Sequence, residues 1–372
     1  MAKGRPPRIL VATAFPLLIL VACGSAAKPG VGADGGNGAA DGASFDSGGA
    51  SGDGASGDAA EAGPAPMADP CIEAGTCPVG QWIDVTPSDM NPKVLSPPTS
   101  PSANTAFGPG AVVGDPSRPT DLYIAEGGAG LWKSTDYGSH WTNINPSIGY
   151  SPIGIPIAVA GTTPATIWLS QGQGNGTVLK STDGGQSFQT IPQSLAADLY
   201  SIEVDPNDTT HLISGLHEVD GLVESIDGGT TWRTVGGSGW PTGGISFYPF
   251  FIDTGNAATT RTTWFAIAQD GATPVITSDG GASWTSPNGL SGLQHPHGSA
   301  RLDQRGSTLF VAGIEGPGQG VYRSTDMGAN SLGTLPSALP IGPNSIVVTN
   351  DGTHSIVVGA MWAAGIWIYV EP

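Results

Sequence analysis

Short apolar runs alternate with turn signals from about residue 80 to the end of the chain. Each of six successive units contains two runs. The first runs cover 111–113, 155–159, 199–204, 247–252, 300–302 and 346–348, and the second cover 122–125, 167–169, 212–216, 264–267, 309–314 and 356–361. Turn signals such as Asp115-Pro116 and Asn350-Asp351-Gly352 separate the runs of a unit. Short runs between such signals predict β-strands.

A second pattern, Ser/Thr-x-Asp-x-Gly-x-x-Trp/Phe, follows the two runs in five of the units. Its aspartates lie 47, 44, 52 and 47 residues apart, a period that suits a four-stranded propeller blade. Asp and Gly predict a tight turn in which the carboxylate accepts backbone N–H bonds, and the aromatic residue packs against the blade. We therefore expect a structural role for the five aspartates, which are Asp136, Asp183, Asp227, Asp279 and Asp326. The fifth copy has Ser331 in place of the aromatic residue.

This motif resembles the Asp-box, or BNR repeat, of sialidases, sortilin-type receptors and xyloglucanase-type hydrolases, and the resemblance covers about residues 80–372. It implies an all-β fold, a single β-propeller, with the ligand on the face opposite the Asp boxes. The sixth unit lacks an outer strand, because Gly365–Ile368 aligns with Gly130–Lys133 and the chain stops at Pro372. Trp82–Pro87 resembles Trp141–Pro146, so the N-terminal strand should complete the last blade. We predict six four-stranded blades over 71–372. A seventh blade would require strands in a region that we interpret as loop.

The N-terminal residues 1–22 have the pattern of an export signal. Basic residues at 3, 5 and 8 precede an apolar stretch, Ile9–Ala22, that is too short to span a bilayer. The stretch ends in Leu20–Gly24, which resembles the bacterial lipobox and implies a lipidated Cys23; the alternative is an ordinary signal peptide with a chance cysteine. No Asp follows Cys23, which favours the outer membrane of the cell envelope.

Residues 23–70 are predicted to form a disordered tether. They consist mainly of Gly, Ala, Ser and Asp, and cannot bury enough apolar surface to offset the entropy of ordering. Cys71 and Cys77 follow, and in an exported protein they indicate a small disulfide loop, with a metal pair as the alternative.

Charge excludes one class of partner. The formal net charge is −18, so nucleic-acid binding is not expected. We expect a monomer that contacts the membrane through Cys23 and binds a glycan or an envelope protein. No cofactor is predicted, although the acidic loops leave Ca²⁺ open.

Candidate site residues lie where the inner strand of each blade starts and in the loop between its second and third strands. Glu126, Glu218, Asp220, Asp270 and Glu315 are carboxylates of these loops. A pair drawn from Glu218, Asp220, Glu315 and Asp270 would suit acid–base work or glycoside hydrolysis. The ligand-binding candidates are Tyr200, His217, Tyr248, His295, His297, Arg301 and Trp362. For the acids the alternative is a solvated surface, and for His295 and His297 it is a divalent metal site.

Three functions remain open. The first is a non-catalytic, lipid-anchored propeller that binds a glycan or protein at the cell surface. The second is an exported glycoside hydrolase or lyase acting on a neutral polysaccharide. Sialidase activity is not expected, because the Arg-Ile-Pro-like motif that the resemblance requires has only Gly154-Ile155-Pro156 as its counterpart. The third is an assembly role resembling that of the photosystem II assembly propellers.

Overall fold

The computed structural model describes part of the chain. The described residues are 78–90, 108–126, 130–148, 154, 156–170, 177–192, 194–195, 198–270, 273–290, 300–302, 308–313, 319–330, 332–336, 339–362 and 364–372. The predicted signal, the tether and all three cysteines lie outside these ranges, as do His295, His297 and Glu315. No helix among the described residues is long and apolar enough to cross a membrane.

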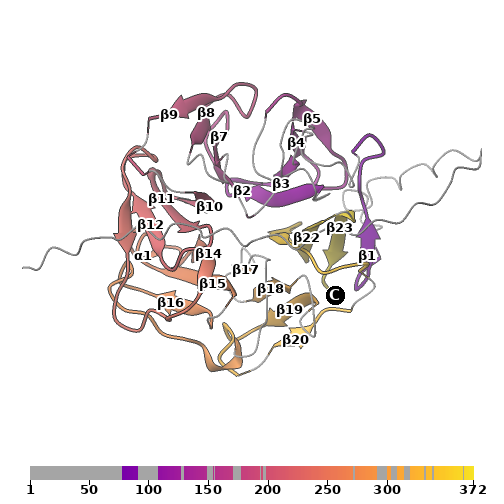
Figure 1. Ribbon diagram of the computed structural model, residues 1–372. Coiled ribbons are helices and arrows are strands. Elements are labelled where there is room, and N and C mark those ends of the chain that lie inside the picture. The colour runs from indigo at the N-terminus through magenta and orange to yellow at the C-terminus, as the bar shows by residue number, and fades with distance from the viewer. Residues whose placement is uncertain are drawn as a thin grey trace, which may run out of the picture. The chain divides into compact units, whose positions relative to one another are not determined.

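Six antiparallel sheets form a ring, which is a six-bladed β-propeller (Figure 1). We number the blades 1 to 6 in chain order. Blade 1 contains β2 (Pro109–Asp115), β3 (Arg118–Glu126), β4 (Gly130–Ser134) and β5 (Thr142–Asn145); blade 2 contains β6 (Ile157–Ala160), β7 (Thr166–Ser170), β8 (Val178–Ser181) and β9 (Gln189–Ile191); blade 3 contains β10 (Leu199–Asp205), β11 (Asp208–Leu216), β12 (Leu222–Ser225) and β13 (Arg233–Val235).

The second half of the chain continues the same order. Blade 4 contains β14 (Ile245–Phe251), β15 (Trp264–Asp270) and β16 (Val275–Thr277), with a helical turn α1 (Ala257–Thr260) between the first two; blade 5 contains β17 (Ala300–Leu302), β18 (Leu309–Gly313), β19 (Gly320–Ser324) and β20 (Gly333–Thr334); blade 6 contains β21 (Ser345–Asn350), β22 (Ser355–Met361), β23 (Gly365–Val370) and β1 (Trp82–Asp84). A 3₁₀ turn (Asn288–Leu290) precedes blade 5. The innermost strands β2, β6, β10, β14, β17 and β21 contact one another in succession, and β21 returns to β2. The predicted six blades are confirmed.

The N-terminal strand closes the ring, as the sequence predicts. Strand β1 pairs antiparallel with β23, with Trp82 opposite Tyr369. Their rings are 5.3 Å apart, and both side chains are buried between blades 5 and 6. The first and last parts of the propeller are therefore held in one sheet.

Each of the five motif copies forms the turn between the third and fourth strands of a blade; we call these the aspartate turns. In blade 2, Asp183 Oδ1 accepts hydrogen bonds from the Ser181 hydroxyl (2.7 Å) and the Ser187 backbone N–H (3.0 Å). The Ser181 hydroxyl in turn accepts the N–H of Gly185 at 2.8 Å. Hydrogen bonds led by the Ser187 side chain lower the pKa of Asp183 to about 2. The carboxylate is thus used within the turn, as expected of a structural residue.

Blade 4 departs from the pattern in its fourth strand. After the aspartate turn, the chain makes a single antiparallel bridge, from Thr285 to Ile276. The linker from blade 3 pairs with the same segment, because the Ser238 N–H donates to Ala282 and the Ser238 carbonyl accepts from Trp284. The linker therefore covers the outer edge of the segment 282–285, which lies between it and β16.

Candidate functional site

The aspartate turns lie at the end of the ring where the innermost strands finish. Among the described residues, hydrogen bonds join four of the five turns to the start of the second strand, as from Tyr137 N–H to the Thr120 carbonyl (3.0 Å) and from Gly228 N–H to the Thr210 carbonyl (2.8 Å). We call this the turn end. The opposite end, where innermost strands begin and second strands run to third strands, is the loop end.

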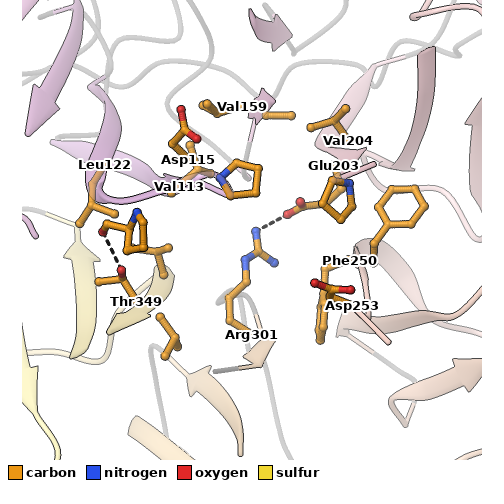
Figure 2. A pocket seen from close by; sticks show the side chains of 18 residues that line it. Val113, Asp115, Leu122, Val159, Glu203, Val204, Phe250, Asp253, Arg301 and Thr349 are labelled. Carbon is orange, nitrogen blue, oxygen red and sulfur yellow. Dashed lines mark hydrogen bonds and ion pairs between the residues drawn. The ribbon is translucent and has the colours of Figure 1, made fainter. Parts of the chain in front are cut away.

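A cavity of about 370 Å³ occupies the central channel at the turn end (Figure 2). We call it the turn-end pocket. All six innermost strands contribute to its wall, with Val113, Val159, Glu203, Phe250, Arg301 and Val348 among the lining residues. Prolines of the adjoining turns, Pro116 and Pro206, line it as well. Apolar residues outnumber polar ones in the wall, but polar and apolar atoms face the cavity to a similar extent.

An ion pair crosses the pocket between blades 3 and 5. The Arg301 guanidinium donates to the Glu203 carboxylate, and the two side chains are only 13% and 19% exposed (Figure 2). Arg301 also donates to the Ala300 carbonyl at 3.0 Å, and its guanidinium carbon lies 5.7 Å from the centre of the Phe250 ring. Burial raises the pKa of Glu203 above its ordinary value, although the charge of Arg301 opposes that shift.

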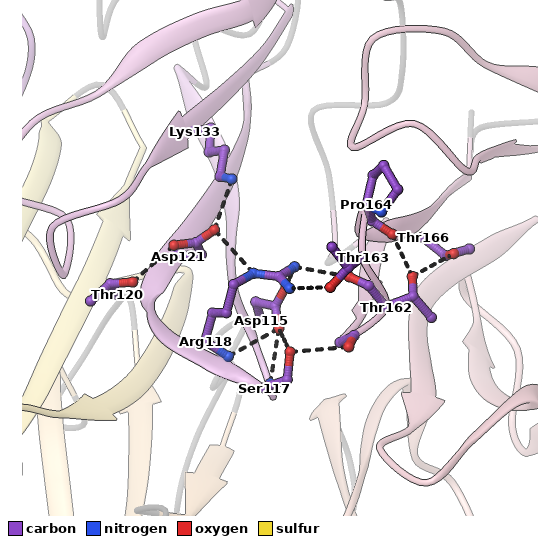
Figure 3. Close-up of polar contacts among 11 residues, drawn as sticks. Asp115, Ser117, Arg118, Thr120, Asp121, Lys133, Thr162, Thr163, Pro164 and Thr166 are labelled. Atoms are coloured by element: carbon purple, nitrogen blue, oxygen red, sulfur yellow. Dashed lines mark hydrogen bonds and ion pairs between the residues drawn. The ribbon is translucent and has the colours of Figure 1, made fainter.

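Two further carboxylates line the pocket, and they differ in their exposure to solvent. Asp115 is buried and accepts hydrogen bonds from Ser117 and from Arg118, which also donates to the Thr162 carbonyl of blade 2 at 3.1 Å (Figure 3). This network joins blades 1 and 2. Asp253 is exposed at the mouth, where it accepts the Gly255 N–H at 2.9 Å. The pocket wall therefore holds three carboxylates and one guanidinium.

At the loop end, the structure brings three predicted site residues together. The rings of Tyr200 and His217 stack at 4.9 Å, and Tyr248 lies 5.4 Å from Tyr200. The Tyr200 hydroxyl donates to Gln269 Oε1 at 2.8 Å, and His217 Nδ1 lies 3.4 Å from an Asp198 carboxylate oxygen. Tyr200 and Tyr248 are, however, only 3% and 1% exposed, so they offer no open platform for a sugar ring.

The predicted carboxylates are distributed differently. Glu218 is exposed, in a left-handed backbone conformation (φ 54°), with its N–H bonded to the Ser246 hydroxyl at 2.9 Å. Asp220 accepts the Trp240 indole N–H at 2.7 Å and thereby holds the linker to blade 4.

The remaining predicted residues are placed as follows. Asp270 ends β15, but its side chain is outside the described part, as is Glu315. Trp362 is half-buried after β22. Arg301 was expected with the loop-end residues, yet its side chain points into the turn-end pocket (Figure 2).

A buried glutamate at the loop end is the second unusual carboxylate. Glu126, the last residue of β3, is fully buried, and neither of its carboxylate oxygens has a hydrogen-bond partner among the described residues. Burial raises the pKa of Glu126 to about 7; the nearby Trp132 indole lowers it slightly, and the charge of Asp89 raises it. The Trp132 N–H lies near the carboxyl without meeting hydrogen-bond geometry.

A third buried polar group joins the strands of blade 3. His211 is fully buried, with Nδ1 3.1 Å from an Asp205 oxygen and Nε2 2.8 Å from a Glu224 oxygen. Burial lowers the pKa of His211, but hydrogen bonds to the two carboxylates raise it by more. Because an ionised carboxylate only accepts hydrogen bonds, an imidazole with a proton on both ring nitrogens suits both contacts.

Glu203 and Asp253 were not among the predicted site residues. Glu203 lies in the run Leu199–Asp205, whose other members before the final Asp are apolar or small. An acidic residue within a run of buried positions could have pointed to Glu203. Glu126 stands in such a run as well.

The comparisons with known proteins agree with the fold. No family model matches the chain. The chain is 26% identical to a xyloglucanase from a Paenibacillus species over 307 residues, which is 73% of this chain but 26% of that protein. It thus spans about a quarter of the length of the curated relative it matches.

Two solved structures resemble the propeller. A GH74 xyloglucanase from Xanthomonas campestris aligns with a TM-score of 0.50 and 18% identity, over 77% of this chain and 53% of that chain. A Bacteroides thetaiotaomicron protein of unknown function aligns with a TM-score of 0.54 and 10% identity, over 78% and 75%. Together, the comparisons show a β-propeller similar to those of xyloglucanases.

Proposed function

We propose that this propeller is a non-catalytic module that binds a neutral glycan in the turn-end pocket. The observation that carries the proposal is the Glu203–Arg301 pair, held in a cavity of about 370 Å³ whose wall combines apolar and polar side chains. Ligand pockets of about 300–1,000 Å³ typically combine apolar walls with a few placed polar groups. A perturbed carboxyl pKa inside such a cavity adds to the indication of a functional site.

The groups in the pocket suit a sugar. A hydroxyl both donates and accepts, so it can bond to the Glu203 carboxylate and to the Arg301 guanidinium. The Phe250 ring adds an apolar surface for the C–H face of a sugar ring. The similarity to a xyloglucanase, 26% over 307 residues, supports the same ligand class.

Charge favours a neutral glycan over an acidic one. Asp115 is paired with Arg118, which leaves Glu203 and Asp253 facing a single guanidinium, that of Arg301. An anionic sugar would meet a net negative wall and would find the guanidinium already paired.

The proposal moves the ligand from the face implied by the Asp-box resemblance to the turn end. The reason is the cavity with its ion pair, whereas the loop-end tyrosines are buried. Glu218, exposed at the loop end, therefore serves as the matched control in a binding test.

The test is calorimetric titration of the full chain with neutral and acidic polysaccharides, xyloglucan among them. Loss of a hydrogen bond to a charged group costs about 1.5–3 kcal/mol, so Glu203→Gln should weaken neutral-glycan binding about 10- to 100-fold. Glu218→Gln should bind like the unmodified chain, and thermal melting would verify folding of both variants. The opposite result, loss with Glu218→Gln alone, would return the site to the loop end.

Glycoside hydrolysis is the second candidate. Two carboxyls, Glu203 and Asp253, line one pocket, and Glu203 has the raised pKa expected of a general acid. Mass spectrometry of xyloglucan incubated with the full chain would detect released oligosaccharides. Products that disappear in both Glu203→Gln and Asp253→Asn would favour the enzyme, while binding without products would favour the module.

We also propose that the protein is exported and anchored to the bacterial outer membrane through Cys23. The lipobox-like Leu20–Gly24 and the tether over residues 23–70 support this location. Cys23→Ser should release the protein from the membrane fraction, as checked by fractionation and by the mass of the N-terminal peptide. The anchor would be contradicted if Cys23→Ser stayed in the membrane fraction and the unmodified protein gave no acylated N-terminal peptide.

A further inference from the structure

Two buried tyrosines lie in the channel beyond the turn-end pocket. Phe250 and Glu203 are pocket residues of β14 and β10. Tyr248 precedes Phe250 by two residues and so projects from the same face of β14. Tyr200 precedes Glu203 on β10 and contacts Tyr248 with a ring separation of 5.4 Å. Neither tyrosine lines the pocket, and both are almost fully buried.

The two rings belong to a hydrophobic cluster that includes residues of blades that are not neighbours. Four clusters each lie between two neighbouring blades, namely 6 and 1, 5 and 6, 2 and 3, and 3 and 4. The fifth combines residues of the interface between blades 1 and 2 with residues of the interface between blades 4 and 5, which are not neighbours. Tyr200 of blade 3 and Tyr248 of blade 4 belong to this cluster, and their rings contact each other.

The surroundings of Tyr200 leave little room beside the ring. A Cβ placed on Gly154 would lie 2.1 Å from the Tyr200 carbonyl oxygen and 3.0 Å from its ring. His217 stacks on the same ring at 4.9 Å, and Gln269 accepts its hydroxyl hydrogen bond. The tyrosines therefore form a packed layer between the pocket and the loop end, which we call the tyrosine floor.

We propose that the turn-end pocket is blind and receives the end of a neutral glycan chain, not an internal segment. This inference rests on the proposed function. An internal segment needs two exits from its binding site, whereas a pocket that the tyrosine floor closes has one, at the turn end. The terminal sugar enters with its hydroxyls toward Glu203 and Arg301, and the rest of the chain leaves through the mouth beside Asp253.

The test uses the full chain and xyloglucan fragments of graded length, sized by chromatography. The number of protein molecules bound per glycan chain is measured by calorimetry. If ends are recognised, this number stays constant as the fragments lengthen, and chemical modification of the recognised terminal sugar abolishes binding. If bound molecules per chain rise in proportion to length, end recognition is overturned while glycan binding stands. If no fragment binds, the proposed function and this inference both fail.

Two variants of Tyr248 then test whether the tyrosine floor causes the preference for chain ends. Tyr248→Phe keeps the ring and should keep a constant number bound per chain. Tyr248→Ala opens the floor and should weaken the preference for ends, seen as a number bound that begins to rise with length. A folded Tyr248→Ala protein with unchanged end preference would overturn the role of the floor. The measurement on the unmodified chain does not depend on the folding of either variant.

Discussion

Replacing Glu126 with glutamine should stabilise the propeller at neutral and alkaline pH. The pKa of this carboxyl is raised from 4.5 to about 7, chiefly by burial. A raised pKa in the folded state means that ionisation is more costly there than in the unfolded chain. Stability from the protonated group is therefore fully present below about pH 4.5 and is lost as pH rises through about 7.

The size of the effect follows from the two pKa values. They differ by about 2.5 units, and each unit corresponds to about 1.4 kcal/mol. The ionised carboxylate should therefore cost the folded protein about 3 kcal/mol at about pH 8 and almost nothing at about pH 4. Glutamine has a similar shape and stays neutral, so Glu126→Gln should avoid the loss.

The assay is urea unfolding of the full chain, followed by tryptophan fluorescence, at several values from about pH 4 to pH 8. The difference in free energy of unfolding between Glu126→Gln and the unmodified protein should grow to about 3 kcal/mol over this range. Glu218→Gln, an exposed glutamate at the same end of the ring, is the control and should follow the unmodified protein. Parallel profiles for all three proteins would refute the reasoning, because they would mean that the Glu126 carboxyl is hydrated or paired.

Three further changes test the fold. His211→Gln should cost about 3–5 kcal/mol by removing the imidazole between two buried carboxylates, whereas the surface variant His354→Gln should cost under about 1 kcal/mol. Because the folded pKa of His211 is raised, the difference should be greatest below about pH 6.5 and shrink at higher pH; a flat difference would contradict a protonated imidazole. Gly215→Ala should destabilise by about 3 kcal/mol or more, since its Cβ would lie 1.8 Å from a backbone oxygen of blade 4, while Gly236→Ala, with nothing within 4 Å, should melt like the unmodified protein. Trp82→Ala should cost about 3–5 kcal/mol in urea unfolding if β1 closes the ring, and a near-zero effect would contradict that closure.

The fold could be predicted because its signals are local and repeated. Each aspartate turn carries its own hydrogen-bond donors and acceptors within a few residues, as Ser181, Asp183 and Gly185 show. The closing strand was also predictable, because Trp82–Pro87 repeats a pattern found at Trp141–Pro146. The missing outer strand of the sixth unit required a strand from elsewhere in the chain.

The candidate site was less predictable, because it depends on contacts between distant blades. Glu203 and Arg301 are 98 residues apart and meet only across the channel. The sequence placed Arg301 at the start of an inner strand, but it could not show which way the side chain turns on a strand of three residues. It placed Tyr200, His217 and Tyr248 at one end of the ring, because inner strands begin where second strands run to third strands, but it could not show that the tyrosines are buried.

The carboxylates of this propeller fall into two kinds. Those of the aspartate turns accept several hydrogen bonds, which hold the pKa of Asp183 and Asp279 at about 2, so their ionised form favours the folded state. Burial instead raises the pKa of Glu126 and Glu203, so their ionised form disfavours it. Selection for stability alone would replace such residues with apolar ones, because well-packed apolar side chains are often as stabilising as a buried ion pair or more so. Carboxylates that weaken the fold therefore require an explanation other than stability. The binding role proposed for Glu203 predicts that Glu203→Gln loses glycan binding without losing the folded propeller.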